Sequence, residues 1–153
     1  MKVLVKISGD LVKNHLVIEE IKKLSKTNDV TLIHGAGTQI STALKNKNIP
    51  YGFINGIRQT TEEGLKICFE ESQKARKNLE KQLAGFDVTI LSPCSCINGM
   101  ISNVNAEEIF RDMHEDFDEK IIFTISDREK PFIEGLRGVK MVRVRAKSYK
   151  WQE

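Results

Sequence analysis

Four short motifs place charged side chains and asparagines beside glycine-rich turns, and they follow one another along the chain. They are Lys6-Ile7-Ser8-Gly9, His34-Gly35-Ala36-Gly37, Asn55-Gly56-Ile57-Arg58-Gln59-Thr60 and Asn103-Val104-Asn105-Ala106-Glu107. Glycine turns let a backbone approach a ligand and leave N–H groups free, while lysine and arginine bind phosphate and carboxylate oxygens. Because the motifs stand at the ends of apolar runs, the set is typical of a sheet protein that holds a phosphorylated or carboxylated small molecule.

Two of the cations stand where an anion would meet them. Lys6 ends an apolar run just before a glycine turn, and ligands of open α/β sheets collect at the carboxyl ends of the strands. Its ammonium group would contact a phosphate oxygen there; equally, Lys2, Leu4 and Lys6 would share one partly solvated strand face. Arg58 precedes a long helical pattern, where its guanidinium would form a two-pronged carboxylate site or remain an ordinary surface group.

The other polar residues of the motifs have both a structural and a functional interpretation. Asn105 is in place to cap a helix, and Glu107 to supply a favourable charge in its first turn. In the functional alternative, Asn103 holds a substrate and Glu107 orients lysines around a phosphate. His34 is interpreted as a hydrogen-bonded structural residue, and the spacing of the histidines and cysteines predicts no metal site.

The glycine turns do not complete either common nucleotide fingerprint. Gly35-Ala36-Gly37 opens like a dinucleotide-binding sequence, but Ile40 stands where the third glycine belongs, and there is no P-loop sequence. A dinucleotide dehydrogenase and a P-loop enzyme are therefore disfavoured. In the alternative interpretation, the turns at Ser8-Gly9 and at Gly35-Ala36-Gly37 are simply tight connections between a strand and a helix.

Apolar runs alternate with segments of helical spacing along the whole chain. This pattern predicts strands at 3–7, 30–33, 51–54, 88–91, 121–125 and 139–144, and helices at 11–25, 38–47, 61–83 and 106–113. The last strand alternates and is expected at a sheet edge, Thr60 or Thr61 is expected to cap the long helix, and Cys94-Ser95-Cys96 is assigned to a turn. The alternation predicts one α/β domain over 1–153, a three-layer α/β/α sandwich around a mostly parallel sheet.

Composition, net charge and the length of the apolar runs argue against nucleic-acid-binding and membrane-spanning proteins. The chain has 153 residues, of which 40% are hydrophobic and 29% charged, and its net charge of +3 is too small to indicate nucleic acid. No apolar run is long enough to span a bilayer and no signal-peptide pattern is evident, so we expect a cytoplasmic protein without a membrane partner. Its three cysteines are expected to be free thiols.

Taken together, the four motifs resemble those of the amino acid kinase family, and within it the acetylglutamate kinase branch, over about residues 1–110. The corresponding family patterns are K-x-G-G, H-G-G-G, N-G-x-R-x-T and N-[VI]-N-A-D. The resemblance implies transfer of a phosphoryl group from ATP, with Mg²⁺, to a small carboxylate such as N-acetylglutamate. It also implies an amino acid kinase-like fold and a homodimer paired through the helix at 61–83, whose apolar surface, including Leu65, Ile67 and Phe69, exceeds what one face needs.

The resemblance carries specific roles onto positions of this chain. The implied residues are Lys6 and Glu107 for catalysis; Ser8, Gly9, Gly35, Ala36 and Gly37 for phosphate binding; Arg58 and Asn103 for substrate binding; and Ser126 and Asp127 for the nucleotide. A second catalytic lysine is expected in the family, and Lys140 is the candidate for it here.

Some positions depart from the family pattern. Ser8 and Ala36 replace glycines, with the methyl group of Ala36 expected to crowd the phosphate turn, and Glu107 replaces an aspartate and is one methylene longer than the lysine-orienting role needs. After Glu107 only two strands are predicted, so the family's C-terminal nucleotide half is nearly absent and we expect weak or no nucleotide binding. The alternative function is a catalytically inactive family member that acts as a small-molecule-binding or regulatory homo-oligomer; a purely structural homo-oligomer is a third.

Overall fold

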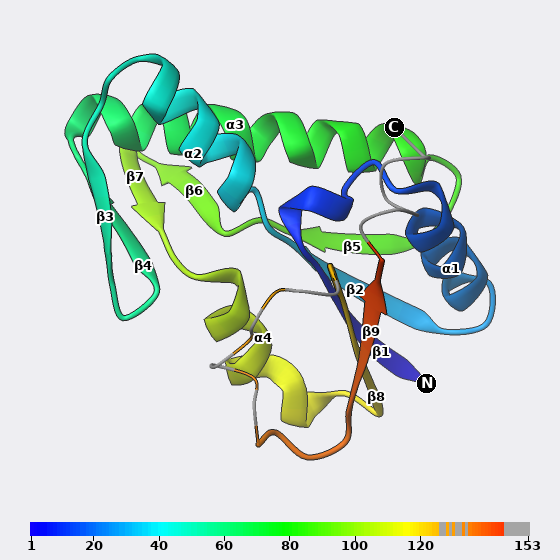
Figure 1. The fold of residues 1–153 in the computed structure, drawn as a ribbon. Coiled ribbons are helices and arrows are strands. Elements are labelled where there is room, and N and C mark those ends of the chain that lie inside the picture. Colours follow the sequence, from blue (N-terminus) through cyan, green and yellow to red (C-terminus); the bar gives the residue numbers. More distant parts are fainter. Residues whose placement is uncertain (126–127, 129, 131–132, 134, 146–153) are drawn as a thin grey trace.

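The centre of the molecule is a five-stranded sheet in the order β5-β2-β1-β8-β9, with β1 in the middle (Figure 1). The computed structural model describes residues 1–125, 128, 130, 133 and 135–145. The strands are β1 (Lys2–Ile7), β2 (Asp29–His34), β5 (Val88–Leu91), β8 (Glu119–Ile125) and β9 (Val139–Val144). Every pair of neighbours in this sheet is parallel, and β9 lies at an edge as predicted.

Helices cover both faces of the sheet, which confirms the three-layer α/β/α prediction. They are α1 (His15–Ser25), α2 (Gly37–Asn46), α3 (Glu62–Gln82) and α4 (Ala106–Met113). Figure 1 shows α2 and α3 on one side of the sheet and α4 on the other. Two short 3-10 turns, Gly9–Leu11 and His114–Asp116, precede α1 and follow α4.

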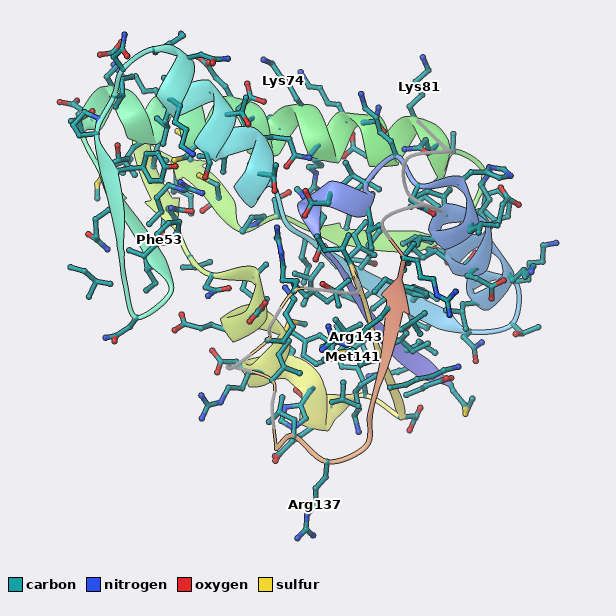
Figure 2. All side chains as sticks on the ribbon, viewed as in Figure 1. Phe53, Lys74, Lys81, Arg137, Met141 and Arg143 are labelled. Atoms are coloured by element: carbon teal, nitrogen blue, oxygen red, sulfur yellow. The ribbon has the colours of Figure 1, made fainter. Side chains whose placement is uncertain are left out.

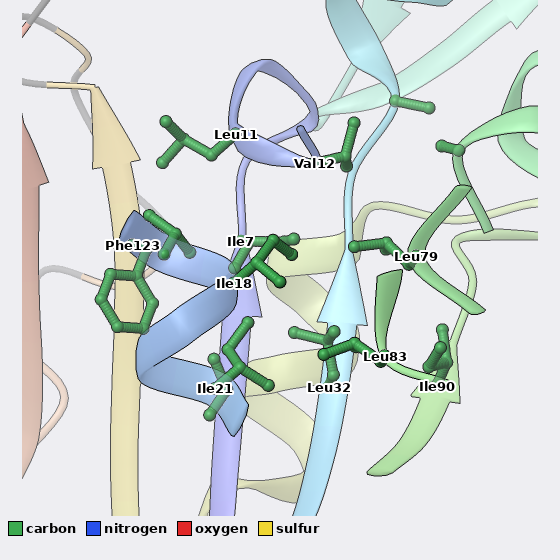
Figure 3. Packing of buried hydrophobic residues seen from close by; sticks show 14 of the residues in the cluster. Ile7, Leu11, Val12, Ile18, Ile21, Leu32, Leu79, Leu83, Ile90 and Phe123 are labelled. Atoms are coloured by element: carbon green, nitrogen blue, oxygen red, sulfur yellow. The ribbon is translucent and has the colours of Figure 1, made fainter. Parts of the chain in front are cut away.

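The alternation of side chains in β1 divides the apolar core in two. Val3, Val5 and Ile7 pack into the larger cluster with α1, α2 and α3, part of which Figure 3 shows. Leu4 points the opposite way, into a smaller cluster built around Phe110 of α4. Both faces of β1 are therefore covered, as expected for a continuous apolar run in a parallel sheet.

Two β-hairpins lie outside the main sheet, and the sequence analysis found only part of them. The first pairs β3 (Tyr51–Ile54) with β4 (Ile57–Thr60), and the second pairs β6 (Cys94–Ile97) with β7 (Met100–Asn103). Each turns at an Asn-Gly pair, in which both residues have positive φ: Asn55 (50°) with Gly56 (78°), and Asn98 (52°) with Gly99 (76°). Asn-Gly is the preferred sequence for such a turn because its two residues tolerate the left-handed conformation.

The assignment of Cys94-Ser95-Cys96 to a turn is wrong, because these residues form β6. Cys68 and Cys94 are buried and Cys96 is exposed, and all three are free thiols, as expected. Burial raises the pKa of the Cys94 thiol to about 11. That thiol therefore stays protonated and unreactive near neutral pH.

Two helix boundaries also differ from the prediction. Helix α1 begins at His15, four residues later than expected, because the side chain of Asn14 accepts a hydrogen bond from the Val17 N–H (3.2 Å) and caps it. Leu16, in the first turn of α1, is 56% exposed. Helix α3 is capped by Thr61, the second of the two candidates, through the Gly64 N–H (3.0 Å).

The position of Ile67 corrects the argument for a dimer through α3. Ile67 is only 4% exposed and packs into the core of its own chain, whereas Leu65 and Phe69 are half-buried. The helix therefore presents less apolar surface to a partner than the sequence suggested, and the dimer stays a prediction.

Candidate functional site

A cavity of about 480 Å³ lies at the carboxyl ends of β1 and β2, between α2, the β3–β4 hairpin and the start of α4. The predicted site residues that line it are Lys6, Ser8, Ala36, Gly37, Arg58, Asn103 and Glu107. Gly9 and Gly35 do not line it. The structure thus brings together residues from all four motifs, and it also adds Arg128 and Lys130, which the sequence analysis missed.

The floor of the cavity is a cluster of two lysines on one carboxylate. Glu107 Oε1 lies 2.7 Å from the Nζ of Lys130 and 3.7 Å from the Nζ of Lys6. All three residues are buried, with 9%, 4% and 3% of their surface exposed. The longer side chain of Glu107 therefore reaches both ammonium groups, so the expectation that it is too long to orient lysines is wrong.

Helix α4 sets the position of this carboxylate. The side chain of Asn105 caps the helix by accepting a hydrogen bond from the Glu107 N–H (2.9 Å), as the structural interpretation of Asn105 predicted. Glu107 is the second residue of α4, and α4 packs on the face of β1 that carries Leu4 and Lys6. The alternative of a partly solvated face holds only at Lys2, which is exposed, because Leu4 is fully buried and Lys6 nearly so.

The second lysine of the cluster is Lys130, not Lys140. Lys130 lies in the segment between β8 and β9, whereas Lys140 is an exposed residue of β9 that does not line the cavity. No motif surrounds Lys130 in the sequence, and only its position after the strand at 121–125 was a signal for it.

Burial shifts the protonation of Lys6 into the neutral range. The pKa of its ammonium group is lowered from 10.5 to about 7, chiefly because burial removes solvent; the nearby charge of Lys130 contributes to this shift and that of Glu107 opposes it. A lysine that titrates near pH 7 responds strongly to any further charge brought beside it.

The N–H groups of two predicted phosphate-binding residues are already used by the fold. The Ser8 N–H donates to the Phe123 carbonyl (3.1 Å), and the Gly35 N–H donates to the Ile7 carbonyl (3.0 Å). The Ser8 hydroxyl also shares a hydrogen bond with the Thr124 hydroxyl (3.1 Å). These contacts extend the strand pairing beyond the ends of β1 and β2.

The first two glycine turns pack directly against each other. A Cβ atom added to Gly9 would lie 2.9 Å from the Cα of Ala36, and one added to Gly35 would lie 3.1 Å from the Gly9 nitrogen. Beside them, Ala36 begins α2 without any side-chain cap, so the helix presents its uncapped first turn at Gly37 to the cavity. Uncapped helix N-termini attract anions, and this turn is the part of the predicted cradle that remains open to a ligand.

Arg58 is a buried residue of the cavity wall, which excludes the surface alternative. Only 8% of its surface is exposed, its Nη2 donates to the Gly37 carbonyl (3.1 Å), and its Cζ lies 4.7 Å from the ring centroids of both Tyr51 and Phe53. Its Nη1 is buried and has no hydrogen-bond partner among the residues that the structure describes. A buried N–H donor without a partner is costly, so this edge of the guanidinium is prepared for an acceptor.

The asparagines connect the hairpins to α4. Asn105 also donates from Nδ2 to the Gly56 carbonyl (3.3 Å), which ties the tip of the β3–β4 hairpin to the start of α4. Asn103 ends β7, is half-buried and lines the cavity. Its amide is thus placed on the same cavity as Arg58.

His34 lies outside the cavity and has a structural role, as predicted. It is fully buried, its Nδ1 contacts the Gly35 carbonyl (3.2 Å) and its Nε2 contacts the Ser92 hydroxyl (2.8 Å). Arg76 of α3 donates to the same hydroxyl (3.2 Å). Burial lowers the pKa of His34, so the ring is neutral and links β2, β5 and α3.

The remaining predictions concern the nucleotide, a metal site and a membrane span. Ser126 and Asp127, predicted to bind the nucleotide, lie outside the described residues. Within the described part of the chain, no three His, Cys, Asp or Glu side chains are grouped to hold a metal ion. In that same part, none of the helices combines the length and apolar character that crossing a membrane requires.

Comparisons with known proteins agree with the resemblance seen in the motifs. The chain is 44% identical to the acetylglutamate kinase of Geobacillus sp. (strain WCH70) over 40 residues, which are 26% of this chain and 16% of that protein. It is 31% identical to the acetylglutamate kinase of Bacillus cereus over 86 residues, 52% of this chain and 34% of that one. No protein-family model matches the chain. The matched region is thus about a third or less of these relatives' length.

Solved structures show the same fold at low sequence identity. N-acetylglutamate synthase from Neisseria gonorrhoeae superposes with a TM-score of 0.67 and 14% identity, over 84% of this chain and 44% of that one. An isopentenyl phosphate kinase superposes with a TM-score of 0.53 and 13% identity, over 83% and 71%. Sequence and fold together confirm the resemblance to the amino acid kinase family and, in sequence, to acetylglutamate kinases.

Proposed function

We propose that this amino acid kinase-like chain transfers a phosphoryl group from ATP to a small carboxylate such as N-acetylglutamate. The observation that carries the proposal is the cavity floor, where two buried ammonium groups share the carboxylate of Glu107. Arg58, whose buried Nη1 has no hydrogen-bond partner among the described residues, lines the wall of the same cavity. One cavity therefore has two lysines that could bind a phosphoryl group and an arginine that could bind a carboxylate.

The chemistry of phosphoryl transfer suits such a floor. Little covalent work is needed from the protein, and catalysis consists mainly of positioning and of neutralising the charge on the transferred group. Lys6 and Lys130 would supply that positive charge. Glu107 would hold the two ammonium groups at one place, because without it two buried cations would repel each other.

Arg58 would orient the acceptor. A guanidinium binds a carboxylate through parallel N–H groups, and the stacking of Arg58 on Tyr51 and Phe53 fixes the plane in which those groups point. Asn103, on the same cavity, would bind a second polar group of that substrate.

The described residues of the cavity suit the phosphates of ATP better than they suit Mg²⁺. ATP, when bound, supplies the phosphoryl group, and the cationic floor with the uncapped start of α2 suits phosphate oxygens. Mg²⁺ is usually held by one or two carboxylates together with the phosphates. Glu107 is the acidic residue that lines the cavity, and its Oε1 already contacts two lysines, so the described residues form no Mg²⁺ site of their own.

The test is formation of an acyl phosphate from ATP and N-acetylglutamate, trapped with hydroxylamine. Lys6→Ala and Lys130→Ala should each lower kcat by about 100-fold or more, the effect of removing one group that stabilises transition-state charge. Lys140→Ala is the matched control and should leave the rate unchanged, because Lys140 is exposed on β9 and does not line the cavity. Equal losses in all three variants would contradict the assignment of Lys130.

A catalytically inactive, ligand-binding protein is the second candidate. The observation that favours it is the short match, since the aligned region is 16% to 34% of the two acetylglutamate kinases compared here. It predicts that N-acetylglutamate raises the melting temperature of the protein, that Arg58→Ala removes this effect, and that no acyl phosphate forms. Turnover by the purified protein would exclude it.

A further inference from the structure

The mouth of the cavity differs in chemistry from its floor. Phe53 and Val104 line the cavity, yet they are 58% and 40% exposed, whereas Lys6 and Lys130 on the floor are 3% and 4% exposed. The cavity therefore runs from a buried cationic end to an open apolar end. Large apolar side chains that are exposed beside a polar site often mark a place where a partner or a ligand binds.

The fold holds the Phe53 ring at this mouth. Phe53 is the cross-strand partner of Arg58 in the hairpin, its ring meets that of Tyr51 edge-on at 6.1 Å and 89°, and the Arg58 Cζ lies 4.7 Å from its centroid. Figure 2 labels Phe53 on this hairpin, beside the body of the molecule. The ring is thus anchored on one side by neighbours and remains open on the other.

The charge of the lining decides what kind of molecule fits. Among the residues that the structure describes, the cationic side chains that line the cavity are Lys6, Lys45, Arg58, Arg128 and Lys130, and the one carboxylate is that of Glu107. Such a lining attracts an anion, and an anion alone would leave the apolar mouth exposed to water.

We propose that the ligand of this cavity is a phosphate or carboxylate that carries an extended apolar substituent. The anionic group binds at the floor, and the substituent covers Phe53 and Val104 at the mouth. This inference rests on the proposed function for the anion site, and it adds the substrate class. A volume of about 480 Å³ lies within the usual range for small-molecule pockets, so both parts of such a ligand find room.

The experiment measures affinity by calorimetry in two matched series. One series is methyl, propyl and hexyl phosphate, and the other is N-acetyl-, N-butanoyl- and N-hexanoylglutamate, so the two kinds of anionic group are tested separately. Each methylene that leaves water should tighten binding by about fourfold. The series that shows this dependence identifies the anionic group.

Variants locate the apolar contact. Phe53→Ala should remove most of the dependence on chain length, and Phe53→Leu should keep much of it, which separates lost contact from lost folding. Met100→Ala is the matched control, because Met100 is a 78% exposed apolar residue that does not line the cavity. Lys6→Ala should weaken all members of the series that binds.

Three results would overturn the inference. If the short and long members of a series bind with equal affinity and binding still depends on Lys6, the proposed function stands, but the ligand does not need an apolar substituent. Binding of hexyl compounds that survives Lys6→Ala would show adhesion to exposed apolar surface only. A chain whose oligomeric state depends on Phe53, with no dependence on chain length, would assign the mouth to a second copy of this chain.

Discussion

Replacing Lys6 by methionine should stabilise the protein, and the gain should depend on pH. Lys6 is nearly fully buried, and its pKa is lowered from 10.5 to about 7, chiefly by loss of solvent and also by the nearby charge of Lys130. Below pH 7 the lysine is charged in both the folded and the unfolded protein, and burying that charge destabilises the fold. Above pH 10.5 it is neutral in both states, so this penalty is absent.

The pKa difference gives the size of the effect. Between pH 7 and pH 10.5 the unfolded chain binds more protons at Lys6 than the folded protein does, so stability rises with pH. At 1.36 kcal/mol per pH unit, the change from 10.5 to about 7 corresponds to about 5 kcal/mol over the whole range. Methionine, an apolar side chain of similar length, has no such penalty, so Lys6→Met should exceed the wild type most at low pH.

The assay is urea unfolding of both proteins at several values between pH 6 and pH 10. The quantity to compare is the difference in the free energy of unfolding between variant and wild type, because most other titrating groups contribute equally to both. This difference should change little below pH 7 and fall steadily from pH 7 to pH 10. A difference that is constant over the range, or one that grows with pH, would refute the assignment of a buried, near-neutral lysine.

Three further predictions concern the glycine turns, the nucleotide and the oligomeric state. Gly9→Ala should destabilise the protein by about 1–3 kcal/mol in urea unfolding, because its Cβ would meet the backbone of Ala36, whereas Gly37→Ala should have little effect, since its Cβ meets no atom within 4 Å. Calorimetry should detect weak or no binding of MgATP: weak binding still allows the proposed phosphoryl transfer, no binding would favour the catalytically inactive alternative, and a dissociation constant in the low micromolar range would contradict the prediction. We also propose a homodimer through α3, which light scattering should show at high concentration and Phe69→Glu should disrupt.

The sequence predicted the parts of the fold whose signals are local. Apolar runs identified four strands of the central sheet, since a parallel strand that is covered on both faces needs such a run, and an alternating pattern identified the edge strand β9. The hairpins were found only in part, because β4 and β6 are short and carry exposed polar residues such as Gln59 and Ser95. Their Asn-Gly turns were the available signal: Asn55-Gly56 was interpreted as part of a ligand motif, and Asn98-Gly99 was not used.

The candidate site was predictable where one motif carries one side chain. Lys6 and Arg58 were expected at an anion site from their positions near a strand end and before a helix, Glu107 was added by the family resemblance, and all three line one cavity. Lys130 was not found, because it reaches the site through the segment between β8 and β9, far from every motif. The use of the Ser8 N–H within the fold was equally invisible, since it depends on which strand becomes the neighbour of β1.

The position of β1 at the centre of the sheet has a consequence for how the molecule folds. β1 is flanked on one side by β8, so contacts such as that between Ser8 and Thr124 join residues 116 positions apart. Chains with many such distant pairings fold slowly, because a long loop must close before the contacts form. A growing chain therefore holds one edge of its central strand open until β8 has been synthesised, and this edge is a site for wrong pairing with other chains. Lys130 follows β8 in the sequence, so it can reach Glu107 only after β8 has been synthesised. The cavity floor therefore forms late, together with the pairing of β1 and β8.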